Sequence, residues 1–177
     1  PLAARSLYPV FHSQTKPAGQ GSPIDLRRLT VMRPILAQIN LAALRANLHV
    51  ARERAPGAQV LAVVKANAYG HGLMRVLPAL AEADGVALLE LEAAVALREQ
   101  HYARRILLLE GFFGTAELPA IAARRLAVVV HHNEQVRMLA TASLAPPPVG
   151  VIRPHTGINR LGFKPAQARH GSQGRCT

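Results

Sequence analysis

Lys65 is the side chain whose position in the sequence most strongly indicates chemistry. It follows a short apolar run, and the ten residues around it, 63–72, read VVKANAYGHG. If the apolar run is a strand of a parallel α/β sheet, Lys65 lies at its carboxyl end, the edge where such folds bind ligands. Apolar neighbours disfavour the ammonium form and make the neutral amine more available. Such an amine can form a Schiff base with an aldehyde.

The rest of this segment also favours a binding site. The small residues at positions 66, 68, 70 and 72 let a ligand approach the backbone closely. Tyr69 offers a hydroxyl donor for a phosphate or a carboxylate. The competing interpretation is a lysine that reaches past the strand end to water, with glycines that serve only the turn.

The elements that must position Lys65 alternate along the chain. Asn40 is typical of a helix cap, and Leu41, Leu44 and Leu48 follow it at helical spacing. Apolar runs predict strands at 60–64, 85–89, 105–109, 126–130 and 149–152, and helices are predicted at 73–83, 91–101, 115–124 and 133–143. The first strand reads as buried on both faces.

Five strands separated by helices favour a parallel sheet, either doubly wound or part of a barrel. No Gly-x-Gly-x-x-Gly follows the first strand, which disfavours a dinucleotide site. A complete (β/α)8 barrel takes about 250 residues. The chain from Val60 onward offers roughly half of that, so we expect an incomplete barrel if the sheet closes in that way.

Composition narrows the classes of function. Most of the net charge of +11 lies in the end segments 1–31 and 151–177, aromatic residues make up 4% and tryptophan is absent. This pattern disfavours a nucleic-acid interface, which would place charge and stacking rings on one structured face. No apolar stretch approaches the roughly 20 residues that cross a bilayer. The single cysteine, Cys176, excludes an internal disulfide framework and fits the cytoplasm.

The string 63–72 closely resembles the pyridoxal 5'-phosphate (PLP) attachment motif of alanine racemases. The resemblance covers about residues 32–163. Further segments of similarity are MRP (32–34), GVA (85–87) through LRE (97–99), ILLLEGFF (106–113) and TGINRLGF (156–163). These segments occur in the order typical of that family.

This resemblance implies a fold, a cofactor and a reaction. The fold would be a partial TIM-type (β/α)8 barrel of about five β/α units, in a family of homodimers. Lys65 would bind PLP through a Schiff base and act as the base for one enantiomer. Tyr69 would contact the cofactor phosphate, and Arg160 would hydrogen-bond near the phenolic oxygen and the substrate carboxylate. The substrate would be alanine, in the supply of D-alanine for peptidoglycan.

The sequence also departs from the family. Alanine racemases usually carry a lysine, an apolar residue and Asn or Asp before Thr-Gly, where this chain has Arg153, Pro154 and His155. Arg153 cannot be carbamylated as that lysine often is, and Pro154 would remove a donor from a strand. We do not assign the family's catalytic tyrosine, which acts across a dimer interface, to Tyr8 or Tyr102.

We expect three segments. Residues 1–31 look like an unstructured extension, residues 32–163 like the incomplete barrel, and residues 164–177 like an irregular tail without the family's C-terminal β-domain. A frameshift or truncation would explain the tail. The chain alone is then expected to be a weak or inactive racemase. A racemase of another small amino acid, a PLP-binding module without turnover and a non-functional fragment remain alternatives.

Other candidate residues are weaker. His131 and His132 suggest a metal, but no third ligand follows at a diagnostic spacing, and Asn133 after them is a plausible helix cap. Glu90 and Glu92 fit a helix start better than a catalytic pair. The arginine pairs at 104–105 and 124–125 precede strands and are expected to form a solvated rim. We predict no metal site.

Overall fold

A computed structural model describes residues 37–158 and 160–166 of the 177-residue chain. The predicted extension 1–31 and most of the predicted tail, with Cys176, lie outside these residues. The compact unit that carries the sheet begins at Ile39. Its strands are β1 (Leu61–Val63), β2 (Gly85–Leu88), β3 (Arg105–Leu108), β4 (Ala127–Val130) and β5 (Val149–Ile152). Its helices are α1 (Leu41–Arg54), α2 (Lys65–Tyr69), α3 (Leu73–Val76), η2 (Leu77–Leu80), α4 (Leu91–Glu99), η3 (Thr115–Glu117), α5 (Leu118–Ala123) and α6 (Asn133–Thr141).

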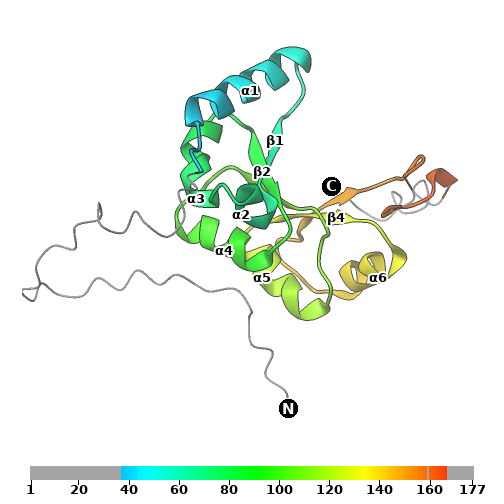
Figure 1. Ribbon diagram of the computed structural model, residues 1–177. Coiled ribbons are helices and arrows are strands. Elements are labelled where there is room, and N and C mark those ends of the chain that lie inside the picture. Colours follow the sequence, from blue (N-terminus) through cyan, green and yellow to red (C-terminus); the bar gives the residue numbers. More distant parts are fainter. Residues whose placement is uncertain (1–36, 159, 167–177) are drawn as a thin grey trace, which may run out of the picture. The chain divides into compact units, whose positions relative to one another are not determined.

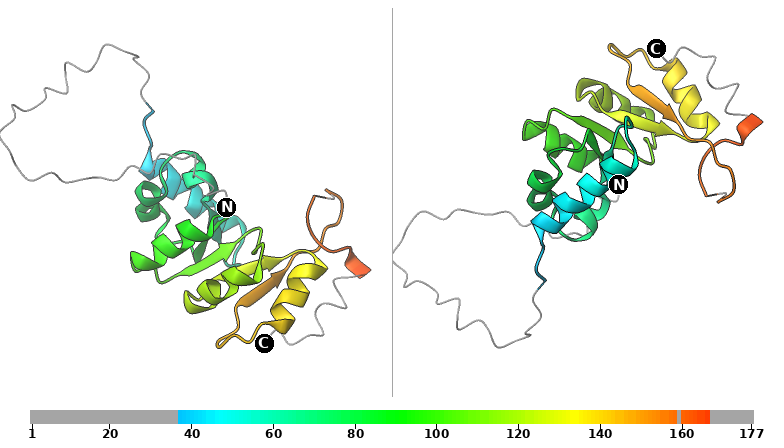
Figure 2. Two further views of the ribbon diagram at one scale, coloured as in Figure 1. Left: turned by 90° about the horizontal axis from the view of Figure 1, so that it is seen from below. Right: turned by 90° about the horizontal axis from the view of Figure 1, so that it is seen from above.

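The five strands form one parallel sheet in chain order, β1-β2-β3-β4-β5. A doubly wound sheet reverses its strand order at a switch point, whereas a barrel adds each strand beside the previous one. The observed order therefore selects the barrel interpretation. The helices after β2, β3 and β4 follow one another around the same side of the curved sheet (Figure 1), and β5 lies at one edge of it in both further views (Figure 2).

The core lies between the helices and one face of the sheet. Because side chains alternate along a strand, every second residue of β2, β3 and β4 points to this face. These residues are buried and pack in one hydrophobic cluster: Val86, Leu88, Ile106, Leu108, Val128 and Val130. Leu97 of α4 and Ile121 of α5 cover them from the helix side and are completely buried. The apolar runs of the sequence thus form the centre of the sheet.

The opposite face of the sheet is apolar but only partly covered. Strand register places Val63, Ala87, Leu107, Ala127 and Val149 in one row across it. Val63 is 45% exposed and Val149 is 58% exposed. The prediction that strand 60–64 is buried on both faces is therefore wrong. The physical reason is position, because β1 lies at the edge of the sheet and, among the described strands, pairs only with β2.

The helix predictions are mostly confirmed. α1 begins where Asn40 predicts, and the Asn40 side chain accepts a 3.0 Å hydrogen bond from the Ala43 amide. The predicted helix 73–83 is wrong as a single element, because it breaks into α3 and the 3-10 helix η2, in which Pro78 has no amide hydrogen to donate. α4 starts after Glu90 with Glu92 in its first turn, as expected.

Candidate active site

Lys65 lies two residues beyond β1, at the carboxyl edge of the sheet. The intervening Val64 is buried, and its amide donates a 2.8 Å hydrogen bond to the carbonyl of Ala87, which extends the pairing of β1 with β2. The backbone that carries the lysine is therefore fixed to the sheet up to the residue before it. This is the placement that the sequence predicts for the amine.

The chain after Lys65 forms a left-handed helical turn. Ala66, Asn67 and Ala68 have φ of 50°, 53° and 55°, and Tyr69 has φ of 55°. Each non-glycine residue costs roughly 1–2 kcal/mol in this conformation, so the turn needs support from its surroundings. The sequence analysis missed it, because no residue of the four is a glycine.

Hydrogen bonds on both sides hold this turn. The amide of Ala68 donates to the carbonyl of Val64 at 2.9 Å, and the amide of Gly70 donates to the carbonyl of Ala66 at 3.0 Å. The Asn67 side chain accepts a 2.7 Å hydrogen bond from the amide of Leu73, the first residue of α3. The strained segment is thus anchored to β1 before it and to α3 after it.

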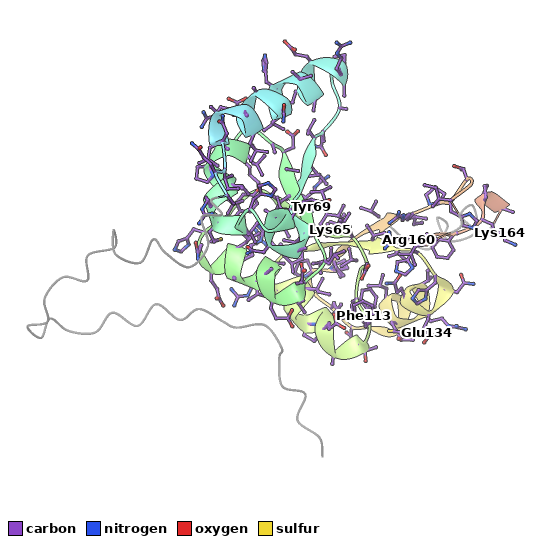
Figure 3. All side chains as sticks on the ribbon, viewed as in Figure 1. Lys65, Tyr69, Phe113, Glu134, Arg160 and Lys164 are labelled. Atoms are coloured by element: carbon purple, nitrogen blue, oxygen red, sulfur yellow. The ribbon has the colours of Figure 1, made fainter. Side chains whose placement is uncertain are left out.

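The left-handed turn brings Tyr69 to the lysine. The Lys65 Nζ atom lies 5.9 Å from the centroid of the Tyr69 ring, which is within the range of a cation–π contact. Tyr69 is 58% exposed, so its hydroxyl is open to a ligand. Figure 3 shows both side chains on the same segment. Of the three residues that the sequence analysis selects, the structure brings these two together.

Arg160 lies beyond β5, on the wall of a cavity of about 270 Å³. Its other lining residues are His131, His132, His155, Leu161 and Gly162. No hydrogen bond or ring contact joins Arg160 to Lys65 or Tyr69 among residues 37–158 and 160–166. The segments that follow β4 and β5 form this cavity, and neither Lys65 nor Tyr69 is among its lining residues. Arg160 and Lys65 both follow the carboxyl ends of strands of the parallel sheet (Figure 3).

Backbone hydrogen bonds join the residues before Arg160 to Phe163, which follows it. The Phe163 amide donates to the Arg153 carbonyl and the His155 amide to the Phe163 carbonyl, both at 2.9 Å. Pro154 lies past the end of β5 and takes part only in an isolated bridge with Phe163. The expectation that Pro154 interrupts a strand is therefore wrong, because β5 ends at Ile152.

Two histidines at this edge have structural partners. The His131 Nε2 atom lies 3.1 Å from the carbonyl oxygen of Glu110, and the His132 side chain caps α6 by accepting from the Gln135 amide. The cap is thus His132 rather than Asn133. Burial lowers the pKa of His131, partly opposed by its contact with the Glu110 carbonyl, while His132 and Arg153 lower it further. His131 therefore favours the neutral form.

Gln135 is a residue of this edge that the sequence analysis missed. Its amide nitrogen donates to the carbonyls of Glu110 at 3.0 Å and Phe112 at 3.1 Å, and its side-chain oxygen accepts from the His131 amide at 2.9 Å. It thereby ties the loop after β3 to the loop after β4. The sequence does hold a sign of its burial: Gln135 is spaced three and four residues from the apolar Met138 and Leu139, which places it on the buried stripe of α6.

Gly111 makes room for this clamp. It has a φ of +73°, and a Cβ atom there would lie 2.3 Å from the Val129 carbonyl oxygen and 2.6 Å from the Gln135 amide nitrogen. Only glycine fits such a conformation and approach without strain.

The described residues 37–158 and 160–166 hold neither a candidate metal cluster nor a candidate membrane-spanning helix. No group of three or more His, Cys, Asp or Glu side chains is arranged to hold a metal ion in that part of the chain. None of the helices described there has the length and apolar character to span a bilayer.

Comparison with known proteins shows the family. The sequence profile of the alanine racemase N-terminal domain matches residues 39–173. The chain belongs to this family. An alanine racemase of Erwinia tasmaniensis is 51% identical over 141 residues, which are 80% of this chain and 40% of the relative. An alanine racemase of Nitrosomonas europaea is 52% identical over 135 residues, 76% of this chain and 37% of the relative.

Solved structures of the alanine racemase family share the fold. The biosynthetic alanine racemase of Pseudomonas aeruginosa superposes with a TM-score of 0.69 at 43% identity over 73% of this chain and 37% of that chain. The alanine racemase of Acinetobacter baumannii superposes with a TM-score of 0.70 at 30% identity, over 76% of this chain and 41% of that chain. The predicted partial barrel is therefore confirmed. The chain spans about 40% of the length of the curated alanine racemases that it matches.

Proposed function

We propose that this chain anchors PLP for a racemase that acts on alanine, and that Lys65 binds the cofactor. One observation carries the proposal: an amine at the carboxyl edge of β1, beside Tyr69, in a chain of the alanine racemase N-terminal domain family. The relatives at about 50% identity are named alanine racemases. A Bartonella henselae alanine racemase, at 25% identity and a TM-score of 0.66, is described with covalently bound pyridoxal phosphate.

The residues present fit this cofactor. Lys65 forms no ion pair with a carboxylate in the part of the chain that the structure describes, and its Nζ atom contacts the ring of Tyr69, the other residue expected to bind the cofactor. The exposed Tyr69 can donate its hydroxyl to a phosphate. The cavity around Arg160 has no acidic residue in its lining, which suits an oxygen anion such as a carboxylate or a phenolate.

These residues have distinct roles in the proposed reaction. Lys65 would hold PLP through its Nζ atom. When bound, PLP delocalises the negative charge that develops at the substrate Cα atom. Whenever its amine is not bonded to the cofactor, Lys65 would take or return the Cα proton on one face, and Arg160 would orient the substrate carboxylate. Racemisation also needs an acid–base group on the opposite face. Tyr102 lies at the amino edge of the sheet, so we do not give it that role.

The finer proposals follow from the family. We place the reaction in the cytoplasm, in the supply of D-alanine for the cell wall, and the active assembly is a homodimer. A second candidate is PLP binding without turnover, because no acid–base group for the opposite face is assigned among the described residues. We expect the 177-residue chain alone to bind PLP and to racemise alanine weakly or not at all.

Adding PLP to the purified chain tests the proposal. The sequence holds three lysines, Lys16, Lys65 and Lys164, so borohydride reduction followed by peptide mass mapping identifies the labelled position without ambiguity. We expect a visible absorbance band, a pyridoxyl adduct on Lys65, and loss of both in Lys65→Arg. Lys164→Arg is the matched control and should retain both.

The outcomes separate the candidates. An adduct on Lys16 or Lys164 instead of Lys65 contradicts the proposed anchor. An adduct on Lys65 without exchange between D- and L-alanine supports the binding module, and measurable exchange supports the enzyme. Robust exchange by this chain alone would overturn our expectation of weak activity.

A further inference from the structure

The amino edge of the sheet, opposite Lys65, carries a second cavity of about 560 Å³. It is formed where β3, β4 and β5 begin. Among the described residues, its lining consists of small apolar side chains and of polar ones that include no Asp or Glu. The polar lining residues are Arg98, Tyr102, Arg104, Arg105, Arg124 and Arg125. We call this the arginine cavity. Its volume lies within the range of about 300–1,000 Å³ typical of small-molecule sites.

Arg98 builds the frame of the arginine cavity. Its guanidinium donates to the carbonyls of Arg124 at 2.9 Å, Arg104 at 2.7 Å and Arg125 at 3.2 Å, and also to that of Tyr102. One side chain thus joins the loop before β3 to the loop before β4. All its acceptors are neutral carbonyls, so its positive charge is not compensated by a carboxylate.

The charges of the other four arginines are also poorly compensated. Arg104 and Arg105 each donate to a neutral acceptor, the Ala83 carbonyl at 2.8 Å and the Gln59 side chain at 2.9 Å. Arg124 forms the one ion pair among the five arginines in the described part of the chain, 3.3 Å long and exposed, with Glu99. Such an exposed pair contributes little.

Arg125 has the greatest freedom to bind a ligand. Its side chain is exposed and forms no hydrogen bond or ion pair with any residue that the structure describes. Asp84 feels the charge of Arg104, but its carboxylate already binds Arg52 at 3.1 Å. The electrostatic attraction of the cavity for anions is therefore not neutralised from within the described chain.

Tyr102 contributes to the wall of the cavity. Its hydroxyl is buried and has no hydrogen-bond partner within residues 37–158 and 160–166. Burial raises the pKa of Tyr102, against the smaller opposing effect of Arg104 and Arg98, so the hydroxyl keeps its proton at neutral pH. Because this hydroxyl has almost no accessible surface, a ligand in the cavity meets the arginine side chains and not the phenol oxygen.

We propose that the arginine cavity binds a small organic anion through its phosphate groups. Guanidinium groups match the geometry of phosphate oxygens and form paired, charge-assisted hydrogen bonds with them. Several guanidiniums on one wall suit two or more adjacent phosphates better than a single carboxylate. The small apolar residues Ala103, Ala123 and Val149 accept the uncharged part of the ligand. This site is separate from Lys65 and does not depend on PLP.

Isothermal titration of the full chain with inorganic pyrophosphate tests this site, at an ionic strength that screens non-specific attraction. We expect saturable binding that Arg125→Gln weakens about tenfold or more. Arg125→Lys keeps the positive charge but loses the paired N–H donors of the guanidinium, and should give an intermediate affinity. Arg45→Gln on α1 is the matched control, because it removes an equally exposed arginine away from the cavity and should leave binding unchanged.

Two results would overturn the proposal: no saturable binding of pyrophosphate, or an equal loss in Arg125→Gln and Arg45→Gln, which would indicate general attraction to a basic protein. Lys65→Arg should bind pyrophosphate as the unaltered chain does. A failure of PLP labelling at Lys65 is therefore distinguishable from a failure of the arginine cavity.

Discussion

Gln135 illustrates how a single side chain organises the edge of the sheet that carries Lys65. It is 1% exposed and is the only polar residue in the buried set of the described chain. A buried amide stabilises a fold only when its hydrogen bonds are made, and here it reaches from α6 to Glu110, 25 residues earlier in the sequence. The loops of this edge are thus held by a polar clamp rather than by apolar packing alone.

Replacing Gln135 with leucine should destabilise the protein. The substitution leaves the Glu110 and Phe112 carbonyls and the His131 amide without this partner, and an unsatisfied buried group costs about 1–3 kcal/mol. We expect the free energy of unfolding to fall by about 3 kcal/mol in urea titrations. Gln100→Leu, at an exposed position, is the control and should change it little. Equal stability of the two variants would contradict the clamp.

At the scale of elements, Asp84 fixes the amino end of the edge strand β1. Its carboxylate accepts a 2.7 Å hydrogen bond from the Val60 amide, and its own amide donates to the Val60 carbonyl at 2.9 Å. Arg52 of α1 reaches the same carboxylate at 3.1 Å and the Glu82 carbonyl at 2.8 Å. A strand with only one neighbour in the sheet is therefore supported by a side chain and by a helix.

This anchor should make stability depend on acid pH. The hydrogen bond from the Val60 amide, with a smaller contribution from Arg52, lowers the pKa of Asp84 below its ordinary value of 3.8. The unfolded chain then binds more protons than the folded chain below that value, so stability falls as the pH falls through the folded-state pKa. Melting temperatures recorded from neutral to strongly acid pH measure this loss of stability.

A variant isolates the contribution of this one carboxylate. We expect Asp84→Asn to lower the melting temperature at neutral pH and to show a smaller further loss in acid than the unaltered chain. Glu82→Gln, an exposed acid two residues away, serves as the control and should keep the full acid dependence. An unchanged acid profile in Asp84→Asn would rule out this origin.

For the molecule as a whole, the important feature is a sheet that helices cover on one face and whose other face is covered only in part. The row of side chains that includes Val63 and Val149 is apolar and partly exposed, and Val151, two residues after Val149 in β5, is 42% exposed. Among the described strands, β1 and β5 lie at the edges and each pairs with one neighbour. Exposed apolar surface and open strand edges both favour association. The surface opposite the helices is the one expected to find a partner.

The 177-residue chain should therefore self-associate through this face. Sedimentation velocity should show an average mass that rises with concentration in the micromolar range. Val151→Lys places a charge on the apolar face and should reduce association. Val50→Lys is the matched control, since Val50 is 51% exposed but lies on α1. A monomer at every concentration, or an equal effect of both lysines, would contradict the prediction.

Local patterns in the sequence determined the alternation of strands and helices and the position of Lys65 at a strand end. Such patterns suffice because helix caps and apolar runs act over a few residues: Asn40 begins α1, and the runs around Val86 and Val128 become central strands. The same local patterns misjudged the first strand. Whether a strand has one neighbour or two depends on pairing with residues far away in the chain.

The tertiary structure decided everything that depends on such distant contacts. It set the order of the strands, the left-handed turn that brings Tyr69 to Lys65, the clamp of Gln135 and the convergence of five arginines on one cavity. A strained backbone or a buried amide is stable only when groups from other segments satisfy it. Those partners are fixed only when the chain has folded, so no local pattern could reveal them.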